Sequence, residues 1–389
     1  MFDNKQHSFL YLLIVALLLA GCSNAALPEA TPPSPSMQTQ PSISETISGT
    51  ETVPEGSTFE IHYLDVGQAD AALIICDNSA MLIDGGNAED SSLIYAYLET
   101  HNINHLDYIV CTHSHEDHVG GLSGALNYAT VGTAYCSVTD ADTRAFSNFV
   151  KYLAKQDKEI VVPSAGDSFS LGSAEVTILG PVAHNEDPNN MSIVLRIQYG
   201  KTSFLFTGDA ELDEETSILD AGYDISCDVL KVGHHGSRSS TNYRWLREAA
   251  PSYAVISVGI DNEYGHPSED VLSRLRDAEV TVYRTDMQGH IVCASNGETV
   301  SFITERNADA DTLRDAGAGG NHKDHEMPAT AEDTAKAEIT YICNTNSMKF
   351  HYPDCSSVAD MADHNKLEVA STREELIEQG YTPCGRCKP

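Results

Sequence analysis

Positive charge is scarce in this sequence. Among 389 residues, 23 Lys and Arg stand against 57 Asp and Glu, which gives a formal net charge of −34. Such a chain stays soluble but repels polyanions at long range. The balance argues against a tight, non-specific nucleic-acid binder, because such proteins neutralise phosphates with Lys and Arg. It leaves a metal-dependent nuclease open, since bound metal ions can reverse the field within a site.

A long apolar run is also missing near the N-terminus. Residues 9–20 are apolar and follow Lys5, but the run is too short to span a bilayer comfortably. Together with the small residues that lead to Cys22, the pattern predicts an export signal over residues 1–21. The sequence LAGC resembles the lipobox of bacterial lipoproteins, which implies lipidation at Cys22 and anchoring to the membrane, facing the extracellular side or periplasm. An ordinary cleaved secretory signal is the alternative.

Two stretches have few aromatic residues and read as solvated connections. Residues 22–57 are rich in Pro, Ser, Thr and Glu and predict a disordered tether, and residues 306–337 are rich in Gly, Asp and Ala and predict a linker. They separate two expected folded units, a main domain over residues 58–305 and a small domain over residues 338–389. The size of the main unit is typical of one large domain.

Cysteines are spread unevenly over the chain. There are ten, and four of them lie near the C-terminus. Besides Cys22, five occur singly in apolar surroundings and are expected to be buried small hydrophobic residues rather than halves of disulfides. These are Cys76, Cys111, Cys136, Cys227 and Cys293.

Short β-branched runs alternate with helical stretches in the main unit. The expected strands are residues 59–66, 71–75, 108–112, 175–179, 192–198, 203–206, 229–232 and 253–258. The expected helices are residues 91–101, 144–155, 211–221, 242–248 and 268–278. Strands occur both in clusters and alternating with helices. This arrangement predicts an α/β (α+β) fold in which two sheets pack between outer helices, an αββα sandwich.

The most specific motif follows the apolar run 108–111. Residues 112–121 read THSHEDHVGG, so a loop at the end of a strand carries His113, His115, Asp117 and His118. Neutral imidazoles and carboxylates are ligands that suit zinc, manganese or iron. The motif therefore predicts a metal site.

HSHEDH resembles the HxHxDH signature of the metallo-β-lactamase superfamily. More closely, residues 59–305 resemble the soluble hydrolase domain attached to the DNA-uptake channel protein of naturally competent bacteria. The matching segments are residues 64–70 (LDVGQAD), 82–86 (LIDGG), 206–210 (FTGDA), 230–237 (LKVGHHGS) and 264–267 (YGHP). The membrane channel of that family has no counterpart here, so transport is not implied.

The resemblance implies one or two divalent ions, zinc or manganese. His113 and His115 would hold one ion, Asp117 and His118 the other, and Asp209 would lie between them. The third histidine expected on the first ion is missing, and Asn190, a water or His184 are the candidates to replace it.

The remaining ligand is a histidine that the sequence leaves ambiguous. His235 is favoured, followed by His266 and then His234. Asp84 and Asp65 are expected to orient ligands from behind. Asn190, Ser192 and Ser237 are candidates to contact a substrate or phosphate.

Metal ions lower the pKa of bound water to about 7, which creates a nucleophile at neutral pH. The hypothesis is a phosphodiesterase or nuclease that acts on DNA through a metal-bound hydroxide, with Asp117, Asp209 and His235 as catalytic residues. A β-lactamase or another carbonyl-ester or lactone hydrolase is the alternative, because the same chemistry attacks carbonyl carbon. A second alternative is a non-catalytic surface lipoprotein that binds DNA or a partner. No protein partner is indicated.

The small C-terminal unit has its own metal-site pattern. His351, Cys355, Cys384 and Cys387 have the spacing of a closed structural zinc site, and so short a unit needs a metal or disulfides to hold together. Residues 350–355 (FHYPDC) and 380–384 (GYTPC) resemble the metal-binding domain of the bacterial Ada methylation-repair protein. The resemblance implies one structural zinc, with DNA binding or docking as the expected role and passive stabilisation as the alternative. Cys343 is left over, either to replace His351 or to form a disulfide.

Overall fold

The computed structural model describes residues 53–314 and 339–384, apart from residues 346, 354, 360, 363, 364, 372 and 379. The predicted signal and Cys22, most of the predicted tether, and Cys387 lie outside the described residues. The domain boundaries remain predictions. Among the helices of the described residues, none has the length and apolar character to cross a membrane.

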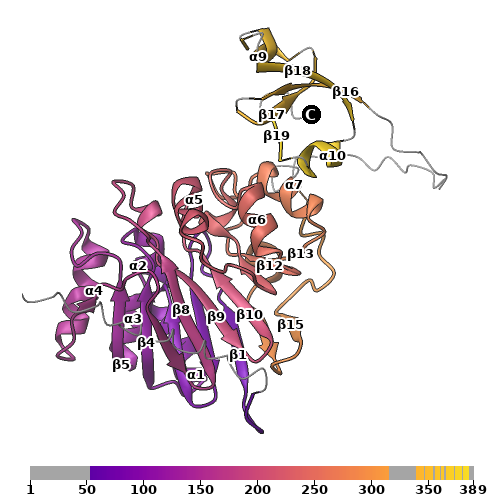
Figure 1. Ribbon diagram of the computed structural model, residues 1–389. Helices are drawn as coiled ribbons and strands as arrows, with labels where there is room; N and C mark the ends of the chain where they lie inside the picture. Colours follow the sequence, from indigo (N-terminus) through magenta and orange to yellow (C-terminus); the bar gives the residue numbers. More distant parts are fainter. Residues whose placement is uncertain are drawn as a thin grey trace, which may run out of the picture. The chain divides into compact units, whose positions relative to one another are not determined.

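The first sheet has eight strands and is antiparallel in one half and parallel in the other (Figure 1). In spatial order the strands are β15 (Val300–Thr304), β14 (Ile291–Ser295), β1 (Phe59–Tyr63), β2 (Ala72–Cys76), β3 (Ser79–Ile83), β4 (His105–Cys111), β5 (Thr130–Cys136) and β6 (Ile160–Val161). The parallel half begins with the pair β3 and β4.

The second sheet has seven strands and repeats this division. In spatial order they are β13 (Thr281–Arg284), β12 (Tyr253–Ile256), β11 (Val229–Lys231), β10 (Thr202–Phe206), β9 (Val194–Tyr199), β8 (Ala174–Gly180) and β7 (Ser168–Leu171). Strands β10 to β13 are parallel, and β7 to β10 are antiparallel. Each sheet therefore offers carboxyl ends of neighbouring parallel strands, where loops with functional side chains can meet.

Three apolar layers hold these elements together. The layer between the sheets includes Phe59 of β1, whose ring stacks on those of Tyr199 and Phe204 of the second sheet at 4.8 Å in both cases. The other two layers lie between each sheet and its own helices. The order helix, sheet, sheet, helix confirms the expected αββα fold class.

The helices have sequences that explain where they begin. Thr143, Asn242 and Ser268 each accept backbone N–H groups in the first turn of the helix that follows, as good N-caps do. The helices of the main unit are α1 (Ser91–Thr100), α2 (Glu116–Val119), α3 (Leu122–Tyr128), α4 (Arg144–Ala154), α5 (Leu212–Ala221), α6 (Tyr243–Ala249), α7 (Glu269–Asp277) and α8 (Thr285–Gln288). Three short 3₁₀ turns add η1 (Ala88–Asp90), η2 (Asn189–Met191) and η3 (Gly233–Gly236).

The C-terminal residues form a separate small sheet in the order β18 (Lys366–Ser371), β16 (Ile339–Asn344), β17 (Lys349–His351) and β19 (Thr382–Pro383). Two short helices, α9 (Ser356–Ala359) and α10 (Arg373–Glu378), belong to it. Its apolar core is small and centres on Tyr341, Cys343, Phe350 and Leu376. So small a core supports the expectation that the unit needs a further stabilising link.

Candidate metal centre

The candidate centre lies where parallel strands of both sheets end. The loop after β4 carries His113 to His118, the loop after β10 carries Asp209, and η3 after β11 carries His235. Asp84 follows β3. The two sheets thus bring together side chains that are more than a hundred residues apart in sequence.

Glycines allow these loops to pack closely. A Cβ atom on Gly121 would lie 1.9 Å from the carbonyl oxygen of Gly85, and one on Gly120 would lie 2.3 Å from the backbone nitrogen of Ala88. Any larger residue would therefore push the histidine loop away from the loop after β3. Asp84 itself has a left-handed backbone with φ 55°, which aspartate tolerates better than most residues.

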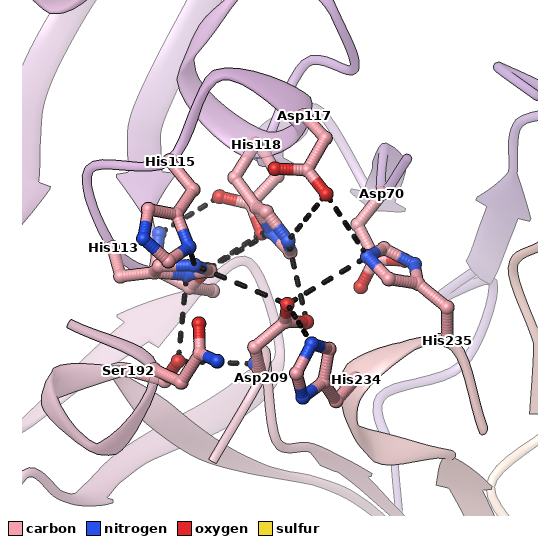
Figure 2. A network of polar contacts seen from close by, with 12 residues as sticks. Asp70, His113, His115, Asp117, His118, Ser192, Asp209, His234 and His235 are labelled. Carbon is pink, nitrogen blue, oxygen red and sulfur yellow. Dashed lines mark hydrogen bonds and ion pairs between the residues drawn. The ribbon is translucent and has the colours of Figure 1, made fainter. Parts of the chain in front are cut away.

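Four side chains form the tightest group. Asp117, His118, Asp209 and His235 each offer one ligand atom, and these atoms all lie within 4.8 Å of one another. Nε2 of His235 is 3.2 Å from Oδ2 of Asp117, and Nε2 of His118 is 3.2 Å from Oδ1 of Asp209. Figure 2 shows these groups turned toward one another. All but Asp117 are buried.

The bonding of this group fits a metal ion. Nε2 of His118 and Oδ1 of Asp209 are buried, and neither has a hydrogen-bond partner despite their proximity. Buried polar atoms normally find partners, because an unmet group is costly. Two imidazoles and two carboxylates are a donor set that suits zinc or manganese. These four side chains therefore agree with the metal site that the sequence motif predicts.

His113 and His115 form the neighbouring part of the centre. Nε2 of His113 is 3.0 Å from Nδ1 of His115 and 4.0 Å from Oδ2 of Asp209. On the other side of the His113 ring, Nδ1 lies 3.4 Å from Oγ of Ser192, which also accepts the Asp209 backbone N–H at 3.0 Å. Ser192 thus ties His113 to Asp209 and acts from behind these groups.

Each imidazole of the four-residue group has a carboxylate near its Nδ1 atom. Nδ1 of His118 donates to Oδ2 of Asp84 over 2.8 Å. Nδ1 of His235 lies 3.1 Å from the carbonyl oxygen of Ser257, its hydrogen-bond partner, and 3.2 Å from Oδ1 of Asp70. A proton on Nδ1 leaves the Nε2 lone pair available, which is the usual arrangement of metal-bound histidine. Asp84 also accepts the backbone N–H and the hydroxyl of Thr112 at 2.8 Å each. The expected orienting role of Asp84 agrees with these contacts.

The carboxylates dominate the electrostatics. Burial alone lowers the pKa of His235, but Asp209 and Asp70 outweigh burial and raise it to about 10. The pKa of His118 is raised in the same way, against burial, by Asp209 and Asp84. Burial raises the pKa of Asp117, but the neighbouring His118 and His235 reverse this and hold it well below its usual range. Protons therefore compete with a metal ion for the imidazoles, and metal binding releases them.

Asn190 also has a structural role. Its side-chain oxygen accepts the backbone N–H groups of Glu211 at 3.1 Å and Glu214 at 3.2 Å, so it caps the start of α5. That oxygen is therefore engaged by backbone groups of α5. The side chain of His184, the other candidate for the missing histidine, is 77% exposed, and its nearest charged partner is Glu186 at 3.9 Å.

Asp65 makes its contacts away from the four-residue group. Its carboxylate pairs with Arg306 at 3.0 Å and accepts the Gly67 backbone N–H at 3.4 Å. The carboxylate of the LDVGQAD motif that reaches a histidine of the centre is Asp70. The orienting role expected for Asp65 stays a prediction, and Asp70 is a second candidate for it.

The order of the three ambiguous histidines becomes clearer. His235 belongs to the four-residue group, whereas His234 lies beside it with Nε2 3.5 Å from Oδ2 of Asp209 and Nδ1 3.1 Å from Glu211. The ring centre of His266 is 6.5 Å from that of His235, outside the group. Ser237 contacts the hydroxyl of Ser239 at 2.8 Å. Which of these residues bind a metal or substrate remains a prediction.

Asp70, Lys231 and Glu211 also lie at the centre, although the sequence alone did not predict a role for them there. Lys231 is buried, donates to Asp70 over 2.9 Å, and so compensates a carboxylate next to His235. The available signal was a lysine at the end of an otherwise apolar strand, a position that needs a buried acidic partner. Glu211 contacts Nδ1 of His234. No feature of the local sequence indicated this contact.

A second group of possible ligands lies in the C-terminal sheet. Ligand atoms of His351, Cys355 and Cys384 all lie within 4.8 Å of one another, and the two Sγ atoms are 4.0 Å apart. Nδ1 of His351 is buried without a hydrogen-bond partner, which fits a metal ion. Cys343 lies outside this group and packs in the small core, so it does not replace His351. The fourth expected ligand, Cys387, lies outside the described residues.

Comparison with known proteins now adds to this geometry. The sequence pattern of the metallo-beta-lactamase superfamily matches residues 64–260. The chain belongs to this superfamily. With its buried histidine–aspartate cluster it is a metal-dependent hydrolase of the metallo-β-lactamase fold.

Three curated proteins are similar over the same region. ComE operon protein 3 of Bacillus subtilis is 29% identical over 60% of this chain and 32% of its own length. Competence protein ComA of Neisseria gonorrhoeae is 30% identical over 61% of this chain and 32% of its own length. Recombination protein 2 of Haemophilus influenzae is 31% identical over 60% of this chain and 28% of its own length. The chain thus spans about a third of the curated relatives it matches and is distantly related to these competence proteins.

Proposed function

We propose that this metallo-β-lactamase-fold protein hydrolyses phosphodiester bonds in DNA. The observation that carries the proposal is the group of Asp117, His118, Asp209 and His235, whose ligand atoms meet within 4.8 Å. The relation to competence proteins supports DNA as the substrate class. Fold alone does not choose among substrates of this superfamily.

Divalent ions supply two things in such a centre, a nucleophile at neutral pH and positive charge to balance a phosphodiester. Zinc and manganese both fit the donors. Asp209 contributes one oxygen toward His118 and the other toward His113, His234 and His235, so it is placed to join the two halves of the centre. Asp117 lies at the more open side and pairs with His235.

His234 is placed to handle a proton. Glu211 accepts from its Nδ1 over 3.1 Å, and its side chain is 21% exposed, so a substrate can reach Nε2. A positioned imidazole of this kind can protonate a leaving oxygen. Ser237 and Ser239 lie on the same loop, where their hydroxyls contact each other at 2.8 Å and that of Ser239 donates to Glu211 at 2.7 Å.

Carbonyl hydrolysis, as in a β-lactamase, is the competing activity. The histidine side of the centre holds His113 and His115, and the third histidine expected on this side is missing from the sequence. This departure from the superfamily pattern favours the phosphodiester reading.

The proposal includes a location and a second metal. The protein is exported and anchored through a lipid on Cys22, facing the extracellular side or periplasm. His351, Cys355, Cys384 and Cys387 hold a structural zinc that stabilises the C-terminal sheet.

Labelled single- and double-stranded DNA incubated with the purified protein and Mn²⁺ or Zn²⁺ tests the activity. Cleavage that is lost in Asp117→Asn is the expected result, and a chromogenic β-lactam in parallel tests the competing activity. Intact DNA with every metal, together with β-lactam hydrolysis, would replace the proposal by the carbonyl alternative. Binding of DNA without turnover of either substrate would favour a non-catalytic surface protein.

A further inference from the structure

The loop between β12 and α7 presents apolar side chains beside the metal centre. Tyr264 is 74% exposed and Ile260 is 75% exposed, and both belong to the same short loop that ends at His266. A single exposed apolar residue is ordinary on a protein surface. Two within five residues, next to a catalytic group, call for a function.

The rings of this loop form a series that leads to the centre. The ring of Tyr264 stacks on that of His266, with centroids 5.7 Å apart and an angle of 23° between the planes. The ring of His266 in turn lies nearly parallel to that of His235, at 6.5 Å and 24°. Tyr264 is therefore the outermost of three near-parallel rings, and the innermost belongs to the four-residue metal group.

The loop is held in this position by polar contacts. The Asn262 side-chain nitrogen donates to the carbonyl oxygens of Gly259 at 2.9 Å and His266 at 2.6 Å, and its side-chain oxygen accepts the His266 backbone N–H at 3.0 Å. Gln68 accepts the Gly259 backbone N–H at 3.1 Å. The exposed ring thus has a fixed place relative to His266.

The chain as a whole carries a formal charge of −34, so ionic attraction over the whole surface cannot supply affinity for a polyanion. Stacking on an aromatic ring can, because every base has a π-face.

We propose that Tyr264 is a stacking platform for the nucleobase next to the bond that is cut. The inference rests on the proposed phosphodiesterase activity and names its substrate class. A base can lie flat on Tyr264 only when it is unpaired, so the platform selects single-stranded DNA or unpaired ends. The bond to be cut then lies on the side of His266 and His235.

Two single strands of equal length test the proposal. One is oligothymidylate, and the other carries the same sugar–phosphate backbone with abasic residues throughout. With Mn²⁺, the wild-type protein is expected to cleave the base-bearing strand with a kcat/KM roughly tenfold or more above that for the abasic strand. The reason is that one base stacked on Tyr264 adds binding free energy. Tyr264→Ala is expected to lose most of this preference, and Tyr264→Phe to keep it.

Ile303→Ala is the matched control. Ile303 lies on β15 and is 72% exposed, so this substitution also removes an exposed apolar side chain. It is expected to leave the preference unchanged. A Tyr264→Ala protein that cleaves both strands with the wild-type ratio would overturn the platform while leaving the proposed activity in place.

A wild-type protein that cleaves neither strand would overturn the proposed activity instead. In that case, binding of a single strand that contains 2-aminopurine tests whether a base stacks on Tyr264, because the fluorescence of 2-aminopurine falls when the base stacks. Quenching by wild type and by Tyr264→Phe, but not by Tyr264→Ala, would support the platform. Equal quenching by all three proteins, or none, would overturn it.

Discussion

The ammonium group of Lys231 donates a hydrogen bond to Oδ2 of Asp70 over 2.9 Å, and both side chains are buried. The other oxygen of Asp70 lies 3.2 Å from Nδ1 of His235, and the Asp70 backbone N–H donates to the carbonyl oxygen of Asp117 at 3.1 Å. Asp70 therefore connects two members of the metal group, and Lys231 balances its charge.

Replacing Lys231 with Met should be strongly destabilising. It leaves the buried Asp70 carboxylate without its cation, and breaking a buried pair in this way costs about 3–5 kcal/mol. Chemical unfolding measures the loss. Because Asp70 holds His235, metal content after dialysis should fall as well.

The double variant Lys231→Met with Asp70→Asn is the control for that experiment. It removes both charges, so stability should recover by a large part of the loss, although His235 is then less well oriented. A single variant as stable as wild type would show that Lys231 does not compensate Asp70.

Asn190→Ala should lower stability by about 1–2 kcal/mol, the usual cost of losing a helix cap, and leave the metal content unchanged. The reason is that the Asn190 oxygen accepts the backbone N–H groups of Glu211 and Glu214. Asn190→Asp keeps an accepting oxygen and should retain the cap. Loss of bound metal in Asn190→Ala, measured by elemental analysis, would instead make Asn190 a ligand.

Glu214 should make stability depend on pH. Burial raises its pKa to about 7, while the Val182 backbone N–H, its donor at 2.8 Å, acts in the opposite direction. The unfolded chain loses this proton near pH 4.5 and the folded protein near pH 7. The contribution of Glu214 to the free energy of unfolding therefore falls as pH rises from about 4.5 to 7.

Glu214→Gln removes this titration and keeps an oxygen for Val182. Relative to wild type, the variant should gain stability between pH 4.5 and pH 8, by on the order of 3 kcal/mol for the full shift. Thermal unfolding of both proteins at the two pH values gives the comparison. A difference that does not change with pH would mean that Glu214 is charged in the folded protein throughout.

The C-terminal sheet should depend on its own metal. Cys355→Ser is expected to lose bound zinc and to increase hydrogen exchange in β16 and β17, because the small core alone holds the sheet weakly. Cys343→Ala is the matched control, since Cys343 is buried but lies outside the ligand group. Zinc that is lost in Cys343→Ala and kept in Cys355→Ser would contradict the assignment.

Much of the fold could be predicted from local sequence. The five expected helices correspond to α1, α4, α5, α6 and α7 with ends that differ by a residue or so, because amphipathic spacing and caps are local signals. The five single cysteines of the main unit are buried and form no disulfide, as expected. Strand β5 was missed, since it contains Gly132 and contributes to a parallel region where polar and apolar residues do not alternate. Helix α3 was missed as well, because Gly124 weakens its pattern.

The candidate centre could be predicted in part. A contiguous motif placed His113 to His118, and the resemblance supplied Asp209 and His235. The residues that contact the Nδ1 atoms of the imidazoles depend on the packing of distant segments, so local sequence does not distinguish Asp70 from Asp65 within the LDVGQAD motif. The capping contacts of Asn190 are beyond local sequence for the same reason, because its partners lie at the start of a helix more than twenty residues later.

The central claim is that the Asp117, His118, Asp209 and His235 group holds the metal that cleaves DNA. The most direct test strips the protein with a chelator, adds Mn²⁺ in steps, and follows bound metal and DNA cleavage in the same samples, with Asp209→Asn beside wild type. The account predicts that cleavage returns in proportion to bound metal in wild type, and that Asp209→Asn loses both. Cleavage that persists in the stripped protein, or in Asp209→Asn at the wild-type rate, would contradict it.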